Sequence, residues 1–248
     1  MPTMACPSLV LVHGGEHASD CWDLTVAELH RQAPELGVLA VDLPGRGSRP
    51  GDLATASIDQ WVTSAVTDIE SAGFGDVVVV GHSMAGVTVP GIAARLGVPR
   101  VRELILATAS VPREGEAIVD TLDGPLAWFA RRAVRRGKPV QVPALVNRYA
   151  FCNGMTRDQR RFAMSRLCPE SVRIVGEPVD RRDFPQDVPR TWILTTRDRA
   201  LSVASQQRSI DAIGGVHHMI SIDACHDVMI SHPEQLAQML IDRCRLYA

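Results

Sequence analysis

Short, continuous runs of apolar residues recur along the chain and constrain its fold most strongly. Four of them are Leu9–His13, Val38–Val41, Val77–Val80 and Leu104–Ala107. Because polar residues do not alternate within these four runs, they are typical of strands covered on both faces. Strand signals resume after residue 189 in "RTWILTTRD" and "HHMISIDACH". Helical spacing separates them, as in "SIDQWVTSAVTDIESAG", where Ser57 is a predicted N-cap. The alternation predicts an α/β fold with a mostly parallel, doubly wound sheet.

The alternation stops in the middle of the chain. Between about residues 112 and 189, "PLAWFARRAVRRGK" and "TRDQRRFAMSRLC" have helical spacing, and strand signals are scarce. We therefore predict a first part of the α/β core over residues 1–111, a helical lid over 112–189 and the second part of the core over 190–248. The lid is expected to cover the carboxyl ends of the strands, where open α/β sheets bind ligands. Near the C-terminus, Ser231 and Glu234 have the spacing of a capping box that would begin the last helix.

The composition argues against several classes of protein. The 248 residues are 46% hydrophobic, and 26 basic against 28 acidic residues give a formal net charge of −2. Without a strong overall charge, neither nucleic acid nor a membrane is expected as a partner. No run reaches the roughly 18 apolar residues of a membrane span, and the N-terminus does not resemble a signal peptide. The six cysteines lack metal-site spacing, so we expect reduced thiols in a cytoplasmic protein, with no metal and no cofactor.

The stretch "VVVVGHSMAG" ends a buried strand on small residues around a serine. A sharp strand-to-helix turn lifts a serine Oγ clear of the sheet, but its strained backbone leaves no room for bulk two residues to either side. Gly81 and Ala85 occupy those positions around Ser83, so the usual G-x-S-x-G pattern carries alanine in place of its second glycine. The stretch predicts a nucleophile elbow with Ser83 as the nucleophile.

A nucleophilic serine needs a histidine base within hydrogen-bond reach. His226 is the predicted base because it follows the last predicted strand, at the edge toward which the elbow points. The other histidines that we weighed fit less well: His30 in a surface helix, His217 and His218 at a strand start, His232 at a helix start, His82 pointing away from the elbow, and His13 supporting the first strand.

The base in turn needs a carboxylate that orients it. Asp198 follows the strand "TWILTT" and gives the chain order Ser, Asp, His that α/β-hydrolases show. Asp223 and Asp227 are rivals, but Asp223 lies in the predicted strand, and Asp227 is too close in sequence to face the ring of His226. Element order therefore favours Asp198.

Two backbone N–H groups should stabilise the oxyanion of an acyl-transfer reaction. One belongs to Met84, directly after the predicted nucleophile. The other comes from the loop after the first strand, "HGGEHASDCW", in which Gly14 and Gly15 allow close backbone approach, and Gly15 is favoured. Gly14 and His82 adjoin these groups and are predicted to border the substrate.

From "LVHGG" through "VDLPGRG", "GHSMAG" and "TTRD" to "ACHDVMISHPEQLA", the chain resembles an α/β-hydrolase along its whole length. More narrowly it is similar to the compact esterases related to plant hydroxynitrile lyases and methyl-salicylate-type esterases. "HGGEHASDCW" matches that group only in part, since Asp20 and Cys21 stand where it tends to carry aromatic or small residues. The resemblance implies Ser83, His226 and Asp198 as triad, with Gly15 and Met84 as oxyanion donors. The lyase branch carries a lysine directly after its catalytic histidine, and Asp227 in that position argues against a cyanohydrin lyase.

The predicted lid concentrates apolar bulk in a chain with only 4% aromatic residues. These side chains would either pack the lid onto the core or line an acyl or aromatic pocket, and the two roles can overlap. The run Arg131–Lys138 is typical of a solvated helix face; if it met substrate, it would favour a carboxylated or phosphopantetheine-bearing one. The predicted substrate-binding residues of the lid are Trp128, Phe129, Tyr149, Phe151 and Met155, with Phe162 and Met164 nearby.

These features together predict a cofactor-independent serine hydrolase that acts on a small to medium apolar or aromatic carboxylic ester through an acyl-enzyme. The same machinery would serve a lactonase, a thioesterase or a biosynthetic cyclase, because a fold does not fix a function. A ligand receptor, a lyase or a cofactor-free oxygenase of the same fold is the alternative outside hydrolysis. The predicted partner is a small-molecule substrate, and the chain is expected to be a monomer or homodimer.

Overall fold

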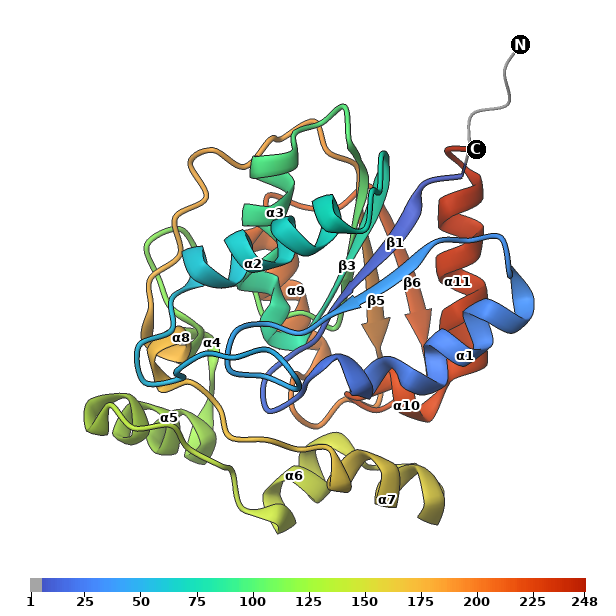
Figure 1. Ribbon diagram of the computed structural model, residues 1–248. Coiled ribbons are helices and arrows are strands. Elements are labelled where there is room, and N and C mark those ends of the chain that lie inside the picture. The colour runs from blue at the N-terminus through green and yellow to red at the C-terminus, as the bar shows by residue number, and fades with distance from the viewer. Residues whose placement is uncertain (1–5) are drawn as a thin grey trace.

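Six parallel strands form the central sheet of the computed structural model, which describes residues 6–248 (Figure 1). Their order is β2-β1-β3-β4-β5-β6. Since the chain passes from β1 out to β2 and returns to β3 on the other side of β1, the carboxyl ends of β1 and β3 border a topological switch point, where such sheets bind ligands. The α/β class and the doubly wound sheet are confirmed. The strands are β1 (Ser8–Val12), β2 (Val38–Val41), β3 (Val77–His82), β4 (Val101–Ala107), β5 (Arg190–Thr195) and β6 (His218–Ile222).

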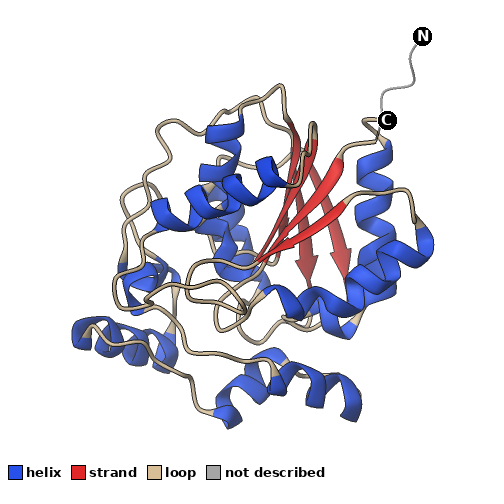
Figure 2. Cartoon of the chain, viewed as in Figure 1, coloured by secondary structure: helices blue, strands red, loops and turns tan. Residues whose placement is uncertain are grey.

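Helices cover both faces of the sheet (Figure 2). Alternate residues of one strand therefore enter two different cores: Val10 and Val12 pack on one side, and Leu9 and Leu11 on the other. This two-sided burial explains why inner strands such as β1 and β3 read as unbroken apolar runs, whereas β6 at the edge of the sheet is mostly exposed. One face carries α2 (Ile58–Ser71), α3 (Val89–Leu96) and α9 (Val203–Ala212). The other carries the 3-10 turn η1 (Ser19–Trp22), α1 (Asp23–Gln32), α10 (Val228–Ser231) and α11 (Pro233–Arg245).

Five helices lie between β4 and β5 in the sequence, and we call residues 112–189 the α4–α8 segment. In Figure 1, α5, α6 and α7 extend across the lower end of the molecule, toward which the strand arrows point. The segment thus covers the carboxyl edge of the sheet, while its exact limits as a lid stay a prediction. Its helices are α4 (Ile118–Thr121), α5 (Gly124–Arg136), α6 (Ala144–Phe151), α7 (Arg157–Ser165) and α8 (Val172–Gly176).

Of the two helix starts predicted from capping residues, one is confirmed and one is wrong. Ser57 caps α2 as expected, and a reciprocal bond from Gln60 completes a capping box. The expected box of Ser231 and Glu234 is wrong: Ser231 ends α10, and α11 begins at Pro233 with His232 as N-cap and no side-chain cap bond. Proline is favoured in the first turn because its missing N–H needs no partner there, and this moves the start past Ser231.

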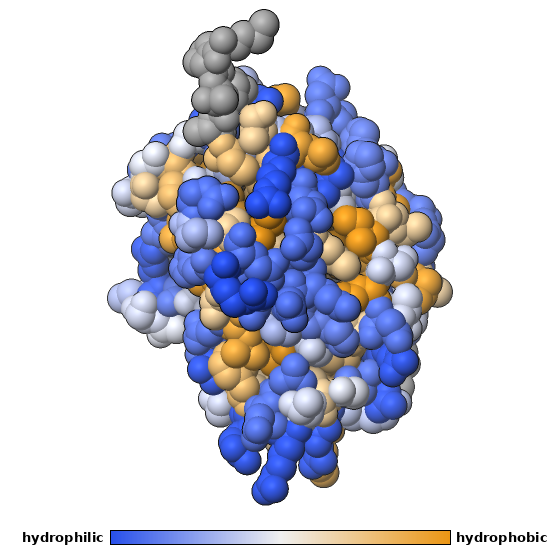
Figure 3. Space-filling view, turned by 90° about the vertical axis from the view of Figure 1, so that its right-hand side faces the viewer, coloured by the Kyte–Doolittle hydropathy of each residue, from blue (hydrophilic) through white to orange (hydrophobic). Residues whose placement is uncertain are grey.

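Hydrophilic side chains dominate much of the surface in Figure 3, with hydrophobic ones in small patches between them. The lower end of that view, where α7 lies, is mostly hydrophilic. Among the described residues, the structure contains no helix long and apolar enough to span a membrane.

Candidate active site

Ser83 lies on a strained turn directly after β3. Its φ is +51°, in the left-handed region that non-glycine residues rarely adopt. A Cβ on Gly81 would lie 2.8 Å from Val89 Cγ1, and one on Gly86 would lie 2.4 Å from the Ser110 carbonyl oxygen. The small residues of the motif are therefore required by close contacts, whereas the methyl group of Ala85 is accommodated in the core.

The helix expected directly after the serine differs in form. A 3-10 turn, η2 (Ser83–Val87), comes first, and α3 begins only at Val89. Pro90 is confined to the first turn of a helix because it has no N–H to donate, so α3 cannot extend back through the motif.

Ser83, His226 and Asp198 form one hydrogen-bonded chain. Ser83 Oγ lies 2.8 Å from His226 Nε2, and His226 Nδ1 lies 2.7 Å from Asp198 Oδ2. The carboxylate can only accept, so Nδ1–H donates to it and Nε2 is left to accept the serine proton. Burial disfavours the imidazolium, but the charge and hydrogen bond of Asp198 outweigh it and raise the pKa of His226 above its ordinary 6.5. The three residues have the geometry of a serine–histidine–acid triad.

Asp198 is held by donors on all sides. Its Oδ2 accepts from Thr108 Oγ1 at 2.6 Å, and its Oδ1 accepts from the backbone N–H groups of Ala200 and Leu201 at 2.7 Å. Burial would raise the pKa of this carboxyl, but the His226 charge and these hydrogen bonds lower it overall. Asp198 is thus kept ionised opposite His226.

The two rival acids lie elsewhere. Asp223 was expected within the last strand, but β6 ends at Ile222 and Asp223 directly follows it. Its exposed carboxylate pairs with Arg197 at 2.6 Å. Asp227 is fully buried and faces His17 instead of His226, with 3.4 Å between His17 Nε2 and Asp227 Oδ2.

His82 is not placed to touch substrate. Its ring is fully buried, and its Nε2 lies 3.0 Å from the backbone oxygen of His226. Burial lowers the pKa of His82 to about 3, so the ring is neutral and supports the loop that carries His226. His13 is likewise buried beside the end of β1, as expected of a structural residue.

The loop after β1 approaches Ser83 closely. A Cβ on Gly14 would lie 2.8 Å from Ser83 Cβ, which explains the glycine at this position. Gly14 therefore contacts the elbow, while Gly15 and Met84 both border the cavity in front of Ser83. The structure thus places the two residues that carry the predicted oxyanion donors on the same wall as Ser83.

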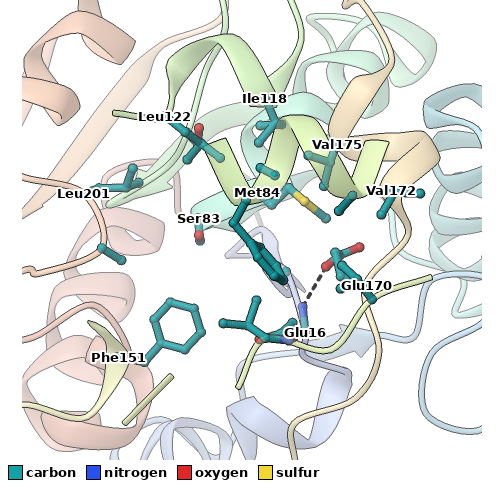
Figure 4. A pocket seen from close by; sticks show the side chains of 18 of the residues that line it. Glu16, Ser83, Met84, Ile118, Leu122, Phe151, Glu170, Val172, Val175 and Leu201 are labelled. Carbon is teal, nitrogen blue, oxygen red and sulfur yellow. Dashed lines mark hydrogen bonds between the residues drawn. The ribbon is translucent and has the colours of Figure 1, made fainter. Parts of the chain in front are cut away.

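A cavity opens in front of Ser83, with about 850 Å³ of space that atoms do not fill, part of it open to solvent. Figure 4 shows Ser83 and Phe151 on its wall, facing Val172 and Val175 of α8. Most of the wall is apolar, and the described lining from the α4–α8 segment includes Ile118, Leu122, Phe129, Ala130, Ala133, Val140, Val142, Phe151, Val172 and Val175.

Only two of the five predicted lid residues line this cavity. Phe129 borders it, and Phe151 stacks on His226. Met155 is buried in the hydrophobic core, and Trp128 and Tyr149 are largely exposed, so these three do not line the cavity in front of Ser83. Helical spacing identifies amphipathic segments but leaves open which of their residues face inward.

The chain matches the alpha/beta hydrolase family over residues 9–239. It belongs to the alpha/beta hydrolase family. Over 118 residues it is 31% identical to the "Carbendazim hydrolyzing esterase" of Nocardioides sp. (strain SG-4G), a match that covers 46% of this chain and 47% of that protein. The chain thus spans about half the length of this relative.

Two other proteins match along nearly the whole chain. The "Pyrethroid hydrolase" of Sphingobium wenxiniae is 24% identical over 260 residues, covering 96% of this chain and 88% of that protein. The structure of an extracellular alpha/beta-hydrolase from a Paenibacillus species, described as sharing structural and functional homology with tobacco salicylic acid binding protein 2, has a TM-score of 0.85. It is 19% identical and covers 95% of this chain and 98% of its own. The likeness to the Paenibacillus structure shows that the two chains share one fold.

Two acidic residues that the sequence analysis did not weigh lie on the cavity wall of this alpha/beta hydrolase (Figure 4). Glu170 pairs with the buried guanidinium of Arg46. Glu16 has no such cation: its carboxylate accepts from Val142 N at 2.6 Å and Asn147 Nδ2 at 2.7 Å. Burial raises the pKa of Glu16 to about 6. In the sequence, the only indication of polar side chains here was the pair Glu16–His17 directly after Gly14 and Gly15.

His17 is a third residue that the sequence analysis missed. Its Nδ1 lies 2.7 Å from the carbonyl oxygen of Gly15, and its Nε2 faces Asp227. Since Nδ1 meets a carbonyl oxygen, it carries a hydrogen and donates it, while Nε2 lies beside the Asp227 carboxylate. Burial opposes the charge, but Asp227 outweighs it and raises the pKa of His17.

One group of side chains could in principle ligate a metal. Ligand atoms of His82, His226 and Asp227 lie within 4.8 Å of one another. Both nitrogens of His226 are already engaged with Ser83 and Asp198, and His82 Nε2 is bound to a backbone oxygen. A metal here would have to break these bonds, so the donor set does not fit a resident ion.

Proposed function

We propose that the protein is a serine esterase that hydrolyses a small to medium apolar or aromatic carboxylic ester through an acyl-enzyme, without a cofactor. The observation that carries the proposal is the hydrogen-bonded chain from Ser83 through His226 to Asp198, which opens onto a largely apolar cavity. The relatives named esterase and pyrethroid hydrolase support ester cleavage.

The proposed chemistry uses each member of this hydrogen-bonded chain. Ser83 Oγ attacks the ester carbonyl carbon while His226 Nε2 removes its proton. The negative charge that develops on the carbonyl oxygen is met by the N–H groups of Gly15 and Met84. His226 then gives the proton to the leaving alcohol as the acyl-enzyme forms, and it removes a proton from water for the second attack. Asp198 holds the tautomer of His226 and stabilises its positive charge.

The cavity favours uncharged acyl groups. Phe129, Phe151 and Val175 supply apolar surface, and the one carboxylate without a cationic partner is that of Glu16. A substrate carboxylate near Glu16 would be repelled. The arginines of α5 are exposed to solvent and do not line this cavity, so they do not compensate that repulsion.

The test is steady-state turnover of a matched panel: an uncharged aryl ester, its carboxylated analogue, the corresponding thioester and a lactone. We expect the highest kcat/KM on the uncharged ester and a loss of at least about 10³-fold in Ser83→Ala and His226→Ala. Turnover of the lactone or thioester alone would move the assignment to those classes. Absence of all turnover in folded protein would contradict the esterase and favour a ligand-binding role.

A further inference from the structure

The peptide unit between Gly15 and Glu16 is held from both ends. Its carbonyl oxygen accepts from His17 Nδ1 at 2.7 Å, and its N–H donates to Glu170 Oε2 at 2.7 Å, the bond dashed in Figure 4. The preceding N–H belongs to Gly15, the predicted oxyanion donor. Fixing this peptide therefore fixes the backbone that directs that N–H.

The loop needs such support because its backbone is strained. Glu16 has a φ of +56°, which costs about 1–3 kcal/mol for a residue with a side chain. Close packing also requires glycine beside it, since a Cβ on Gly15 would lie 2.9 Å from Glu170 Oε2. The loop is held in a conformation that it would not keep alone.

Most of this support comes from the α4–α8 segment. Besides the bond to Glu170, the Glu16 carbonyl accepts from Cys168 N at 2.8 Å, and its carboxylate accepts from Val142 and Asn147. The segment is thus bonded to both the main chain and the side chain of one residue in the loop after β1.

Each of the two holding side chains has its own buried counter-charge. Arg46 pairs with Glu170 from the loop after β2, and Asp227 pairs with His17 from the turn after His226. Buried charges are costly unless they are paired and hydrogen-bonded. Both pairs converge on the same peptide unit, which gives them a common role.

We propose that Glu170 and His17 are positioning residues that aim the Gly15 N–H at the reacting carbonyl oxygen, so that seating of the α4–α8 segment completes the oxyanion hole. This inference rests on the proposed esterase function. Because an oxyanion donor acts mainly in the transition state, loss of its alignment lowers kcat more than it raises KM.

The test compares Glu170→Ala, Glu170→Gln and the wild type on an uncharged aryl ester. We expect Glu170→Ala to lower kcat about 10- to 100-fold with KM within about twofold. Glu170→Gln can present its carbonyl to the Glu16 N–H but turns its amide N–H groups toward Arg46 and Ser171 N, so it should recover only part of that loss. The exposed Asp158 of α7 offers a control, and Asp158→Ala should keep wild-type kcat.

Two readouts separate the possible failures. Wild-type turnover tests the esterase, and the ratio of variant to wild-type kcat tests the positioning role. The inference would be overturned if Glu170→Ala and the wild type had equal kcat, or if the variant raised KM and left kcat unchanged. If Glu170→Ala does not fold, Glu170→Asp keeps the charge beside Arg46 but withdraws it from the Glu16 N–H, and the same kcat loss is expected.

A second, independent observation concerns the outer face of the same segment. Residues 124–169 contain nine arginines, one lysine and a single acid, Asp158, so this stretch carries a net charge of +9 within a chain of −2. The overall charge balance, from which no membrane partner was expected, therefore conceals a strong asymmetry. Helices α5, α6 and α7 bring this charge together at one end of the molecule (Figure 1).

Large apolar side chains are exposed among these cations. Leu145 is 80% exposed, Trp128 66% and Tyr149 63%, and Val146 is exposed beside them. Basic side chains interspersed with exposed Trp, Tyr and Leu match the interface of an anionic bilayer, where the cations meet lipid phosphates and the apolar groups enter the acyl boundary.

We infer that the face formed by α5, α6 and α7 docks reversibly on an anionic lipid surface. Trp128 reports on this directly, because Trp22, Trp61 and Trp192 are at most 2% exposed. With vesicles of phosphatidylcholine mixed with phosphatidylglycerol, we expect co-sedimentation and a blue shift of tryptophan emission. Phosphatidylcholine alone should give neither, and high salt should reverse both.

A charge variant provides the control. Replacing Arg131, Arg132, Arg135 and Arg136 together by glutamine should weaken vesicle binding by about tenfold or more. Trp128→Phe should remove the spectral shift while co-sedimentation remains. Equal binding to neutral vesicles, or none to anionic ones, would overturn the inference. So would a blue shift that grows with protein concentration in the absence of lipid, which would show that a second copy of the chain covers the face.

Discussion

Phe151 stacks on the ring of His226, with 5.1 Å between ring centroids and 24° between ring planes. The phenyl group belongs to α6 and also lines the cavity. It therefore shields the predicted base from water and restricts rotation of the imidazole, while it presents apolar surface to the substrate.

The first prediction concerns this contact. Aromatic pairs contribute about 0.5–1.5 kcal/mol beyond buried area, so Phe151→Ala should lower kcat several-fold to about tenfold. Phe151→Tyr preserves the stacked ring and should stay within about twofold of wild type. Steady-state kinetics on the uncharged aryl ester measures both. A Phe151→Ala enzyme with unchanged kcat would show that the ring does not restrain His226.

The second prediction is the pH profile. His226 must be neutral to accept the serine proton, and its pKa is raised above 6.5, so kcat/KM should fall as the pH drops through that raised value. Without the Asp198 charge, burial lowers the pKa of His226, so Asp198→Asn should move the acid limb of the kcat/KM profile to lower pH. It should also reduce kcat by about 10³–10⁴-fold.

The rival acid supplies the control for that profile. Asp223 is exposed and pairs with Arg197, so Asp223→Asn should leave the acid limb and kcat unchanged. A shift in Asp223→Asn together with none in Asp198→Asn would reverse the assignment of the acid.

The third prediction concerns stability. His17 and Asp227 are both fully buried, and removing one partner leaves the other charge unpaired. Asp227→Asn or His17→Gln should lower the free energy of unfolding by about 3 kcal/mol, and the double variant should lose less than the sum. Urea unfolding of the four proteins measures this coupling. Additive losses would show that the pair is not an interacting unit.

The pH dependence of this pair has a defined sign. The pKa of His17 is raised in the folded protein. Its contribution to the free energy of unfolding is therefore complete below pH 6.5 and is lost as the pH rises through its folded pKa. Burial would raise the pKa of Asp227, but the His17 charge outweighs it and lowers this pKa overall. The contribution of Asp227 to the free energy of unfolding is therefore present above pH 3.8 and is lost as the pH falls through its folded pKa. The coupling should therefore be largest between these limits.

The fourth prediction tests the elbow. A Cβ on Gly86 would lie 2.4 Å from the Ser110 carbonyl oxygen, so Gly86→Ala should lower the free energy of unfolding by about 1–3 kcal/mol and reduce ester turnover. At Gly75 a Cβ meets nothing within 4 Å, so Gly75→Ala is the matched control and should change neither. Thermal unfolding and kinetics compare the two. Equal stability of both variants would contradict the close approach at the elbow.

The sequence predicted the parts of the site that depend on element order. Ser83, Asp198 and His226 each follow a strand, and the carboxyl ends of parallel strands meet at one edge of the sheet, so strand recognition was enough to bring them together. Gly15 and Met84 follow from the same rule, because one succeeds β1 and the other succeeds the serine.

The remaining residues depend on contacts that local patterns do not contain. Glu16 N and Glu170 Oε2 are bonded across 154 positions, and His17 gains its role only through Asp227. Helical periodicity likewise placed apolar bulk in the predicted lid but could not separate the inward Phe129 from the outward Trp128. Such choices are settled by tertiary packing.

The measurement that tests the central claim most directly is the intact mass of the protein after reaction with a fluorophosphonate probe. An activated serine attacks phosphorus and displaces fluoride, so the account predicts one adduct per chain, located by peptide mapping at Ser83. The adduct should be absent in Ser83→Ala and strongly slowed in His226→Ala. An unmodified wild-type protein, or an adduct that persists in Ser83→Ala, would contradict the assignment of Ser83 as the nucleophile.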